Sequence, residues 1–143
     1  MNLRIFTLIV LVCSVFTATT QNTALTKKEI QWQGFETWST GQASKQVISF
    51  VDAHYPSDND LPYLVEKFTK DANAIYQATV VNPEFQPVSG EEKKHLSGKN
   101  IPEKIAISSY VSTERGVDYQ TIQILPFVRK GDEVMKLIRF DLQ

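Results

Sequence analysis

The chain has 143 residues, of which 42% are hydrophobic and 22% charged, and its 15 Lys+Arg against 16 Asp+Glu give a net charge of −1. This balance excludes the basic footprint of a nucleic-acid-binding protein, and the basic pairs Lys27–Lys28 and Lys93–Lys94 suit solvated loops or edges better than a charged face. The length suffices for one domain with its own core and hardly for two.

The first feature along the chain is an apolar run from Ile5 to Phe16, preceded by Arg4 and followed by the small residues Ala18 and Thr20. A basic residue, an apolar core and a small-residue exit form the layout of a secretory signal peptide. The run is shorter than the about 20 residues that cross a bilayer, so an uncleaved anchor or a buried strand is the less favoured interpretation. We expect residues 1–20 to be the signal peptide, with cleavage one or two residues earlier as the alternative.

Cys13 is the only cysteine and lies inside this run, so cleavage leaves residues 21–143 without a thiol. No disulfide, thiolate nucleophile or thiolate metal site is then available. A lipidated Cys13 is the alternative, although Leu11 and Val12 fit poorly the small residues that such a site needs. An exported domain without disulfides favours a bacterial envelope over a eukaryotic extracellular module of similar size. We expect residues 21–143 to form a single β-rich domain with no membrane span.

Short alternations of apolar and polar residues predict strands in the first half of the chain, at residues 29–38, 46–50 and 74–81. Gly34 is expected to form a bulge in the first strand. Residues 82–88 are expected to be irregular or an edge strand, because Pro83 and Pro87 cannot donate to a sheet ladder. Residues 61–71 suit a helix and an extended segment equally well, although Leu64, Val65 and Phe68 have helical spacing and Pro62 suits a first helical turn.

Residues 104–142 predict a three-stranded antiparallel meander, with strands at 104–111, 119–128 and 134–142. Turns at 112–116 and 130–133 separate the strands, and Gly116 is free to adopt a positive φ. The side chains expected to point inward are Ile105, Ile107, Val111, Ile122, Ile124, Val128, Ile138, Phe140 and Leu142. Six or seven short strands predict a mainly β fold, an antiparallel β-sandwich with at most one short helix.

The sequence contains no catalytic, cofactor-binding or metal-binding motif, such as a phosphate loop or a His-Glu-x-x-His helix. His54, near Asp52 and Asp58, comes closest to a hydrolase or metal site, but a single imidazole with loop carboxylates is more typical of an exposed histidine. His95, within a charged run, is expected in a solvated loop. Residues 58–60 (Asp-Asn-Asp) resemble the start of a calcium loop but lack its later Gly and Glu, which favours a turn.

Two kinds of side chain are candidates for contact with a partner. Trp32 and Trp38, with Phe35 between them, suit either a carbohydrate or peptide groove or, as we favour, core and cross-strand packing. Arg115 and Arg129 are expected at turns, where an exposed basic side chain is ordinary but is also able to enter an acidic pocket of a partner.

Six short motifs follow one another between residues 45 and 143: VISF (47–50), LPY (61–63), YQATV (76–80), ERG (114–116), ILPFVR (124–129) and KLIRFDL (136–142). In this order they resemble the N-terminal region of the gingipain-like sortase of the type IX secretion system, a Bacteroidetes envelope protein. More distantly, they resemble the propeptides of gingipain proteases. Each motif is short, and their order and spacing carry the resemblance.

The resemblance implies a β-sandwich-like, noncatalytic prodomain that packs against or restrains a caspase-like cysteine peptidase domain. The catalytic His and Cys of that family lie downstream of Gln143, so this chain is expected not to be an enzyme, and to be either a truncated product or a stand-alone domain. Gingipain propeptides inhibit by placing a basic loop residue in the specificity pocket; Arg115 and Arg129 are candidates, without a matching inhibitory motif. The alternative function is a free-standing exported β-sandwich that binds a glycan or surface protein through Trp32 and Trp38.

Overall fold

The structure is a computed structural model that describes residues 25–41, 43–56, 59–72 and 76–143. The predicted signal peptide and Cys13 lie outside the described residues. Within these ranges the chain is mainly β, with antiparallel sheets and a single short helix, which confirms the predicted fold class. No helix in the described part of the chain has the length and apolarity that crossing a membrane requires.

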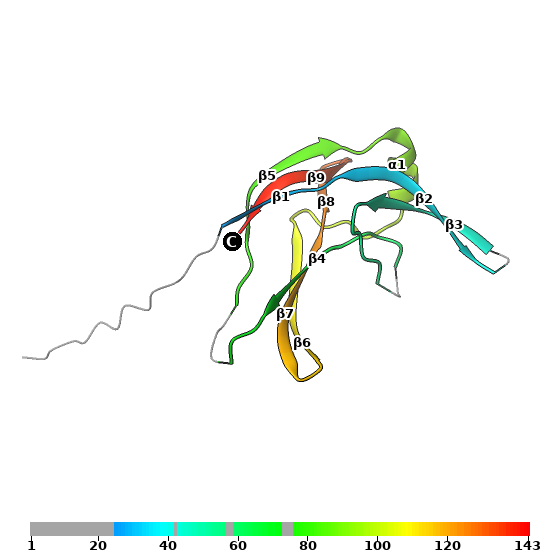
Figure 1. Cartoon of the computed structure of the whole chain (residues 1–143). Coiled ribbons are helices and arrows are strands. Elements are labelled where there is room, and N and C mark those ends of the chain that lie inside the picture. The colour runs from blue at the N-terminus through cyan, green and yellow to red at the C-terminus, as the bar shows by residue number, and fades with distance from the viewer. Residues whose placement is uncertain (1–24, 42, 57–58, 73–75) are drawn as a thin grey trace, which may run out of the picture.

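The elements are β1 (Thr26–Glu29), β2 (Trp32–Thr40), β3 (Ala43–Phe50), β4 (Leu64–Thr69), β5 (Val80–Pro87), α1 (Gly90–Leu96), β6 (Ala106–Glu114), β7 (Val117–Leu125), β8 (Phe127–Lys130) and β9 (Glu133–Leu142). One sheet has the order β1-β9-β5, with β8 also paired to β9; β2 and β3 form a hairpin; β4, β7 and β6 form a third sheet. Figure 1 shows the first sheet across the top of the molecule, the β2–β3 hairpin extending to one side and the β6–β7 hairpin projecting below.

The predicted meander is wrong at one position, Pro126. The segment expected as one strand is two, because β7 ends at Leu125 and β8 begins at Phe127. Proline cannot donate to a ladder, but the Pro126 carbonyl accepts a hydrogen bond from the Leu137 N–H at 2.8 Å. The chain therefore turns a corner and changes sheets, so that β6–β7 and β8–β9 are hairpins of two different sheets.

The upstream strands are partly as expected. The predicted strand 29–38 is divided between β1 and β2, and the predicted bulge at Gly34 is confirmed by its φ of +80° and by a register shift between Trp32 and Gly34. Residues 61–71, which suited a helix or an extended segment, contain strand β4, because its edge pairs with β7 from Leu64 to Thr69.

The segment around residues 74–81 differs from the expected strand, since β5 begins only at Val80. Before it, Thr79 exchanges two backbone hydrogen bonds with Gln143, at 2.8 and 2.9 Å. As expected from its two prolines, β5 lies at the end of its sheet, and its register with β9 shifts between Val81 and Glu84. The prolines thus mark an edge, as predicted.

The one described helix was not expected where it lies. His95 belongs to α1 and not to a solvated loop. Ser89 caps the helix: its side chain accepts from the Glu92 N–H, and the Glu92 carboxylate accepts from the Ser89 N–H. This reciprocal pair is a capping box. At the other end of the helix, the Leu96 side chain is buried.

Two groups of buried side chains fill the space between the sheets. The first contains Ile30, Phe50, Ile122, Ile124, Leu137, Phe140 and Leu142; the second contains Ile48, Leu61, Leu96, Ile101, Leu125, Phe127 and Val134. Trp32 packs against both groups, with its ring 5.1 Å from that of Phe50 and 5.2 Å from that of Phe127. We call the parts of the chain that contribute these buried side chains, together with Trp32, the body.

Candidate interaction surfaces

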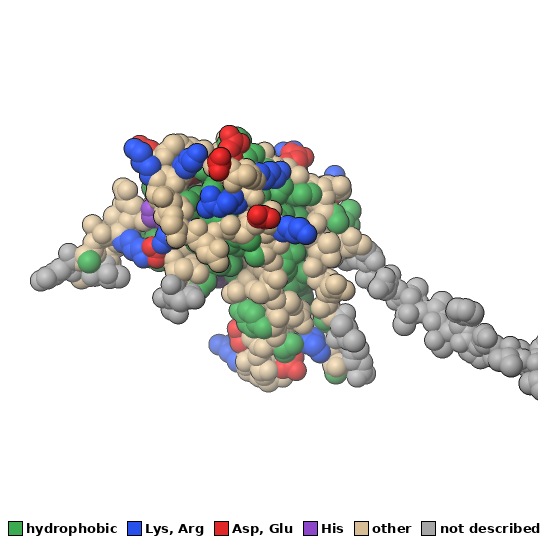
Figure 2. All heavy atoms as spheres, turned by 180° about the vertical axis from the view of Figure 1, so that it is seen from behind, with side chains coloured by type: hydrophobic (Ala, Val, Ile, Leu, Met, Phe, Trp, Pro, Cys, Tyr) green, Lys and Arg blue, Asp and Glu red, His purple; other side chains and the backbone are tan. Residues whose placement is uncertain are grey.

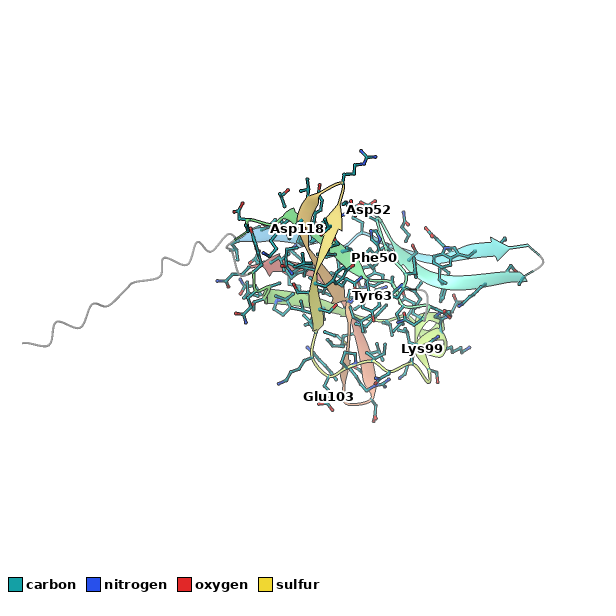
Figure 3. All side chains as sticks on the ribbon, turned by 90° about the horizontal axis from the view of Figure 1, so that it is seen from below. Phe50, Asp52, Tyr63, Lys99, Glu103 and Asp118 are labelled. Atoms are coloured by element: carbon teal, nitrogen blue, oxygen red, sulfur yellow. The ribbon has the colours of Figure 1, made fainter. Side chains whose placement is uncertain are left out.

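The β6–β7 hairpin places Arg115 at the far end of a projection. Arg115 and Gly116 form a two-residue turn between Glu114 and Val117, with φ of +52° and +78°. Positive φ at both positions is the type I′ geometry, whose twist matches that of the strands. Residues 110–119, none of which is buried, form what we call the arm. In Figure 3, Asp118 marks the turn end of the arm, at the opposite end of the hairpin from Glu103.

The arm and the adjoining end of β4 carry exposed apolar side chains. Phe68, Tyr110, Val111 and Val117 are 38%, 46%, 51% and 40% exposed. Figure 2 shows hydrophobic side chains on this projecting part, with charged groups gathered toward its end. By the strand register, Phe68 and Val111 lie on one face of the sheet, and Tyr110 and Val117 lie on the other. Each face thus carries exposed apolar side chains, which are typical of contact surfaces.

Arg129 occupies a different setting from Arg115. It lies within β8, opposite Val134, and its side chain is only partly exposed. Its N–H donates to the Pro102 carbonyl at 2.7 Å, which ties this strand to the chain before β6. Sequence reasoning placed both arginines at turns, but only Arg115 stands at the tip of a hairpin.

The two tryptophans are also in different settings. Trp32 is partly buried, and its indole N–H donates to the Leu137 carbonyl at 2.9 Å, which agrees with the favoured core interpretation. Trp38 is 38% exposed and makes an edge-to-face contact with Tyr55 at 4.2 Å between ring centroids. Tyr55 in turn donates to the Ile48 carbonyl at 2.8 Å, and burial raises the pKa of its hydroxyl. Of the two rings, Trp38 is the one that a ligand can reach.

A groove of about 350 Å³ lies between the loop around Tyr55 and the outer face of the three-stranded sheet. Its lining is polar and aromatic: His54, Tyr55, Pro56, Tyr63, Val65, Lys67, Tyr110, Ser112, Glu114, Thr121 and Gln123. Two of its hydroxyls are engaged with each other across the strands, in the Ser112–Thr121 pair at 3.3 Å. Lys67 forms an ion pair with Glu114 and lies over the Tyr119 ring.

The loop around His54 is the part of the sequence that comes closest to a hydrolase or metal site. His54 is exposed, and its backbone pairs with that of Tyr63 in an isolated bridge. Asp58 lies outside the described residues, and no group of three or more metal-ligating side chains occurs in the ranges that the structure describes. Asn59 accepts from the Leu61 N–H at 2.9 Å, the hydrogen bond of a turn, as the interpretation of residues 58–60 predicted.

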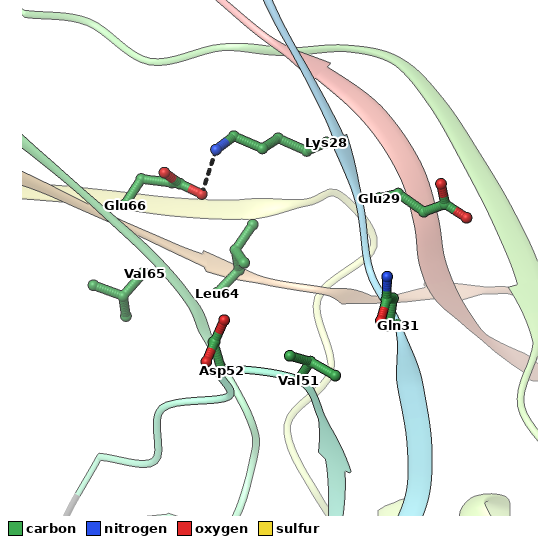
Figure 4. Close-up of a pocket in the computed structure, with 8 residues that line it drawn as sticks. All are labelled: Lys28, Glu29, Gln31, Val51, Asp52, Leu64, Val65 and Glu66. Atoms are coloured by element: carbon green, nitrogen blue, oxygen red, sulfur yellow. Dashed lines mark ion pairs between the residues drawn. The ribbon is translucent and has the colours of Figure 1, made fainter.

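A second cleft, of about 320 Å³, lies between β1 and β4 (Figure 4). Lys28 and Glu66 form an ion pair of 2.7 Å across it, and this pair connects the two sheets. Asp52 and Glu29 also line the cleft, but in Figure 4 the Glu29 carboxylate points away from those of Asp52 and Glu66. The cleft therefore serves as a sheet junction, and its side chains do not converge on a ligand.

Sequence reasoning missed a buried ion pair on α1. Glu92 is 3% exposed, and both of its carboxylate oxygens accept from the Lys136 ammonium, at 2.8 and 3.0 Å. Burial raises the pKa of this carboxyl, but the hydrogen bonds from Lys136 and Ser89 outweigh that effect and hold it below its usual value. The Ser-x-x-Glu spacing of residues 89–92 is the signal from which this helix start could have been predicted.

The comparisons with known proteins agree with the architecture. The fold is similar to a solved structure, the complex of Porphyromonas gingivalis RgpB pro- and mature domains, with a TM-score of 0.52 at 15% sequence identity over 82% of this chain and 76% of that chain. No family model and no curated protein matches the sequence. The chain thus has a fold like that of the noncatalytic gingipain prodomain, which confirms the predicted resemblance at the level of the fold.

Proposed function

We propose that this chain is a noncatalytic, propeptide-like domain that packs against a gingipain-like peptidase domain, as the N-terminal region of a type IX secretion sortase. The observation that carries the proposal is the prodomain-like fold, since the matched structure is a complex of a pro- and a mature domain. An exported location, in the periplasm or on the outer surface of a Gram-negative bacterium, goes with this role.

The arm is the part of the chain best shaped for restraining a peptidase. A type I′ turn holds Arg115 at the end of a two-stranded projection, and no ion pair of Arg115 is found among the described residues. A guanidinium held in this way is free to enter an acidic specificity pocket and to form a bidentate pair there. Arg129 is less suitable, because its strand is anchored at Pro102 and its side chain is partly covered.

The test is binding of the chain to a purified gingipain-like peptidase from the same organism, together with inhibition of that peptidase on an arginine-containing peptide. We expect a complex at micromolar concentration and, for Arg115→Ala, at least tenfold weaker inhibition, equivalent to about 1.4 kcal/mol. Arg129→Ala is the matched control and should inhibit like the unaltered chain. Absence of a complex at tens of micromolar would refute the proposal, and equal effects of the two variants would refute the role of Arg115.

A second candidate function rests on the exposed Trp38–Tyr55 pair beside the groove. In this alternative, a free-standing domain binds a glycan or surface protein against these rings, since aromatic faces suit sugar and peptide stacking. Ligand binding that is lost in Trp38→Ala but kept in Arg115→Ala would favour it over the peptidase partner. Equal binding by both variants would rule out the aromatic pair as the site.

A further inference from the structure

Strand β6 forms an open sheet edge. In the order β4-β7-β6 it is terminal, and among the described residues it pairs only with β7. Its register with β7 runs from Ala106 to Glu114 without a shift. An edge of nine continuous residues offers a row of unpaired backbone groups to another strand.

The turn determines which backbone groups are free. In a two-residue hairpin the flanking residues, here Glu114 and Val117, exchange backbone hydrogen bonds. Because bonded and non-bonded positions alternate along an antiparallel pair, the even-numbered residues of β6 bond to β7. The odd-numbered residues direct their N–H and C=O groups outward: Ile107, Ser109, Val111 and Thr113.

The other outer edges of this sheet and of the sheet β1-β9-β5 carry features that discourage pairing. Strand β5 has two prolines and a register shift, and β1 and β8 have only four residues each, with two basic residues in each. Strand β4 carries the charged residues Glu66 and Lys67. Strand β6 has no proline, lysine or bulge, and its single charge, Glu114, lies at its end. Short strands, charges, prolines and bulges are the usual protection against edge pairing, so β6 is the least protected of these outer edges of the two sheets.

We propose that β6 is a docking edge for the β6 strand of a second copy of this chain, in antiparallel orientation and centred on Tyr110. In this register Ser109 faces Val111 of the other copy and Ser108 faces Ser112, so no two like charges are opposed. Glu114 faces Ala106 and comes near Lys104, just before the strand of the other copy, which gives opposite charges at both ends. The outward groups of the odd-numbered residues then pair with each other.

The pairing also covers apolar surface. Tyr110 and Val111, 46% and 51% exposed, lie at its centre, and the two Tyr110 side chains meet on one face at a position without backbone hydrogen bonds, where side chains are closest. The two Arg115 turns point to opposite ends of the joined sheet and stay accessible. The inference is independent of the proposed function, because the dimer needs no peptidase.

Cysteine cross-linking tests the register. In a full chain carrying Cys13→Ser, which has no other thiol, we expect Tyr110→Cys to form a disulfide-linked dimer under mild oxidation at tens of micromolar. Ser112→Cys is the matched control, since the two copies of residue 112 lie about 13 Å apart in this register. At least tenfold more dimer from Tyr110→Cys supports the proposal. Equal cross-linking of both, or none from either, overturns it.

Sedimentation with uncross-linked protein tests the edge without any thiol. Val111→Lys places a charge on the free edge and should weaken association at least tenfold, whereas Val117→Lys, at another exposed valine near the turn, should not. A chain that stays monomeric at 100 µM overturns the proposal. The proposal is also overturned if β6 becomes paired only after a peptidase domain is added, because the peptidase would then be the occupant of the edge.

Discussion

The body and the arm are built from the same strands but held in different ways. Ile124 and Leu125, at the inner end of β7, are 0% and 3% exposed, whereas the arm at its outer end has no buried residue. The body is therefore stabilised by burial of apolar surface. The arm is shaped by its ladder and by the turn at Arg115–Gly116.

The difference indicates where a partner can be accommodated. Side chains in the arm are free to change with little cost to folding, because surface substitutions usually alter stability by no more than about 0.5 kcal/mol. Side chains in the body are not. A surface that evolves toward a partner is thus expected on the arm and its free edge, and substitutions in matched pairs test this division.

The largest effect is expected for Phe127→Ala. Phe127 is 0% exposed and lies at the corner between the two sheets, against Trp32. Removal of a buried phenyl ring costs about 3–5 kcal/mol through lost burial and the cavity that remains. Phe68→Ala, at a phenylalanine that is 38% exposed beside the arm, should cost less than about 1 kcal/mol. Chemical denaturation of both variants measures the two values, and similar losses would contradict the division.

The next largest effect is expected for Glu92→Ala, which removes one partner of a buried ion pair and half of the capping box. Lys136 is then left largely buried without its carboxylate, a loss of about 3 kcal/mol. The matched substitution is Glu114→Ala, which breaks the exposed pair with Lys67 and should cost at most about 0.5 kcal/mol.

The Glu92–Lys136 pair should also make the stability of the body depend on pH. The pKa of Glu92 is lowered in the folded protein, so its contribution is present above the ordinary carboxyl pKa and is lost as the pH falls through the lower folded value. The acid-induced loss of stability should be smaller in Glu92→Gln than in the unaltered chain. An unchanged acid profile would show that this pair does not contribute to it.

A smaller effect is expected at the turn of the arm. Gly116→Val forces a β-branched residue to a φ near +78°, which costs about 1–2 kcal/mol. Gly116→Asn keeps access to this conformation and should cost much less, since asparagine adopts it readily. Thermal unfolding compares the two variants. If they are equally destabilised, the turn is not what shapes the arm.

The alternating pattern of the sequence was sufficient for the strands but not for their assignment to sheets. Residues 104–142 alternate as three strands, yet Pro126 divides the second of them between two sheets. A strand continues with the same period whichever neighbour it pairs with, so periodicity carries no information about the corner. The proline was visible in the sequence, and its missing N–H was the physical signal of a break.

The prediction of the candidate surfaces was limited in the same way, because local sequence does not show which distant residues a side chain meets. The turn at Arg115–Gly116 follows from local chemistry and was expected, whereas the covering of Trp32 and the exposure of Trp38 depend on Leu137 and Tyr55, which are distant in sequence. Helix α1 was missed because its seven residues show little helical periodicity, although its capping box was present. This helix brings the chain's second histidine into the body.

The smallest effect is expected from that histidine. His95 lies edge-on to Phe35, its Nε2 is buried without a hydrogen-bond partner within the described residues, and burial, with Lys99 nearby, lowers its pKa. The unfolded chain then binds a proton more readily, so stability is full above the ordinary histidine pKa of about 6.5 and declines as the pH falls toward the folded value. Denaturation between pH 7 and 5.5 should show this decline in the unaltered chain and in His54→Gln, where an exposed histidine is replaced. It should be absent in His95→Gln, and an equal decline in both variants would show that His95 is not its source.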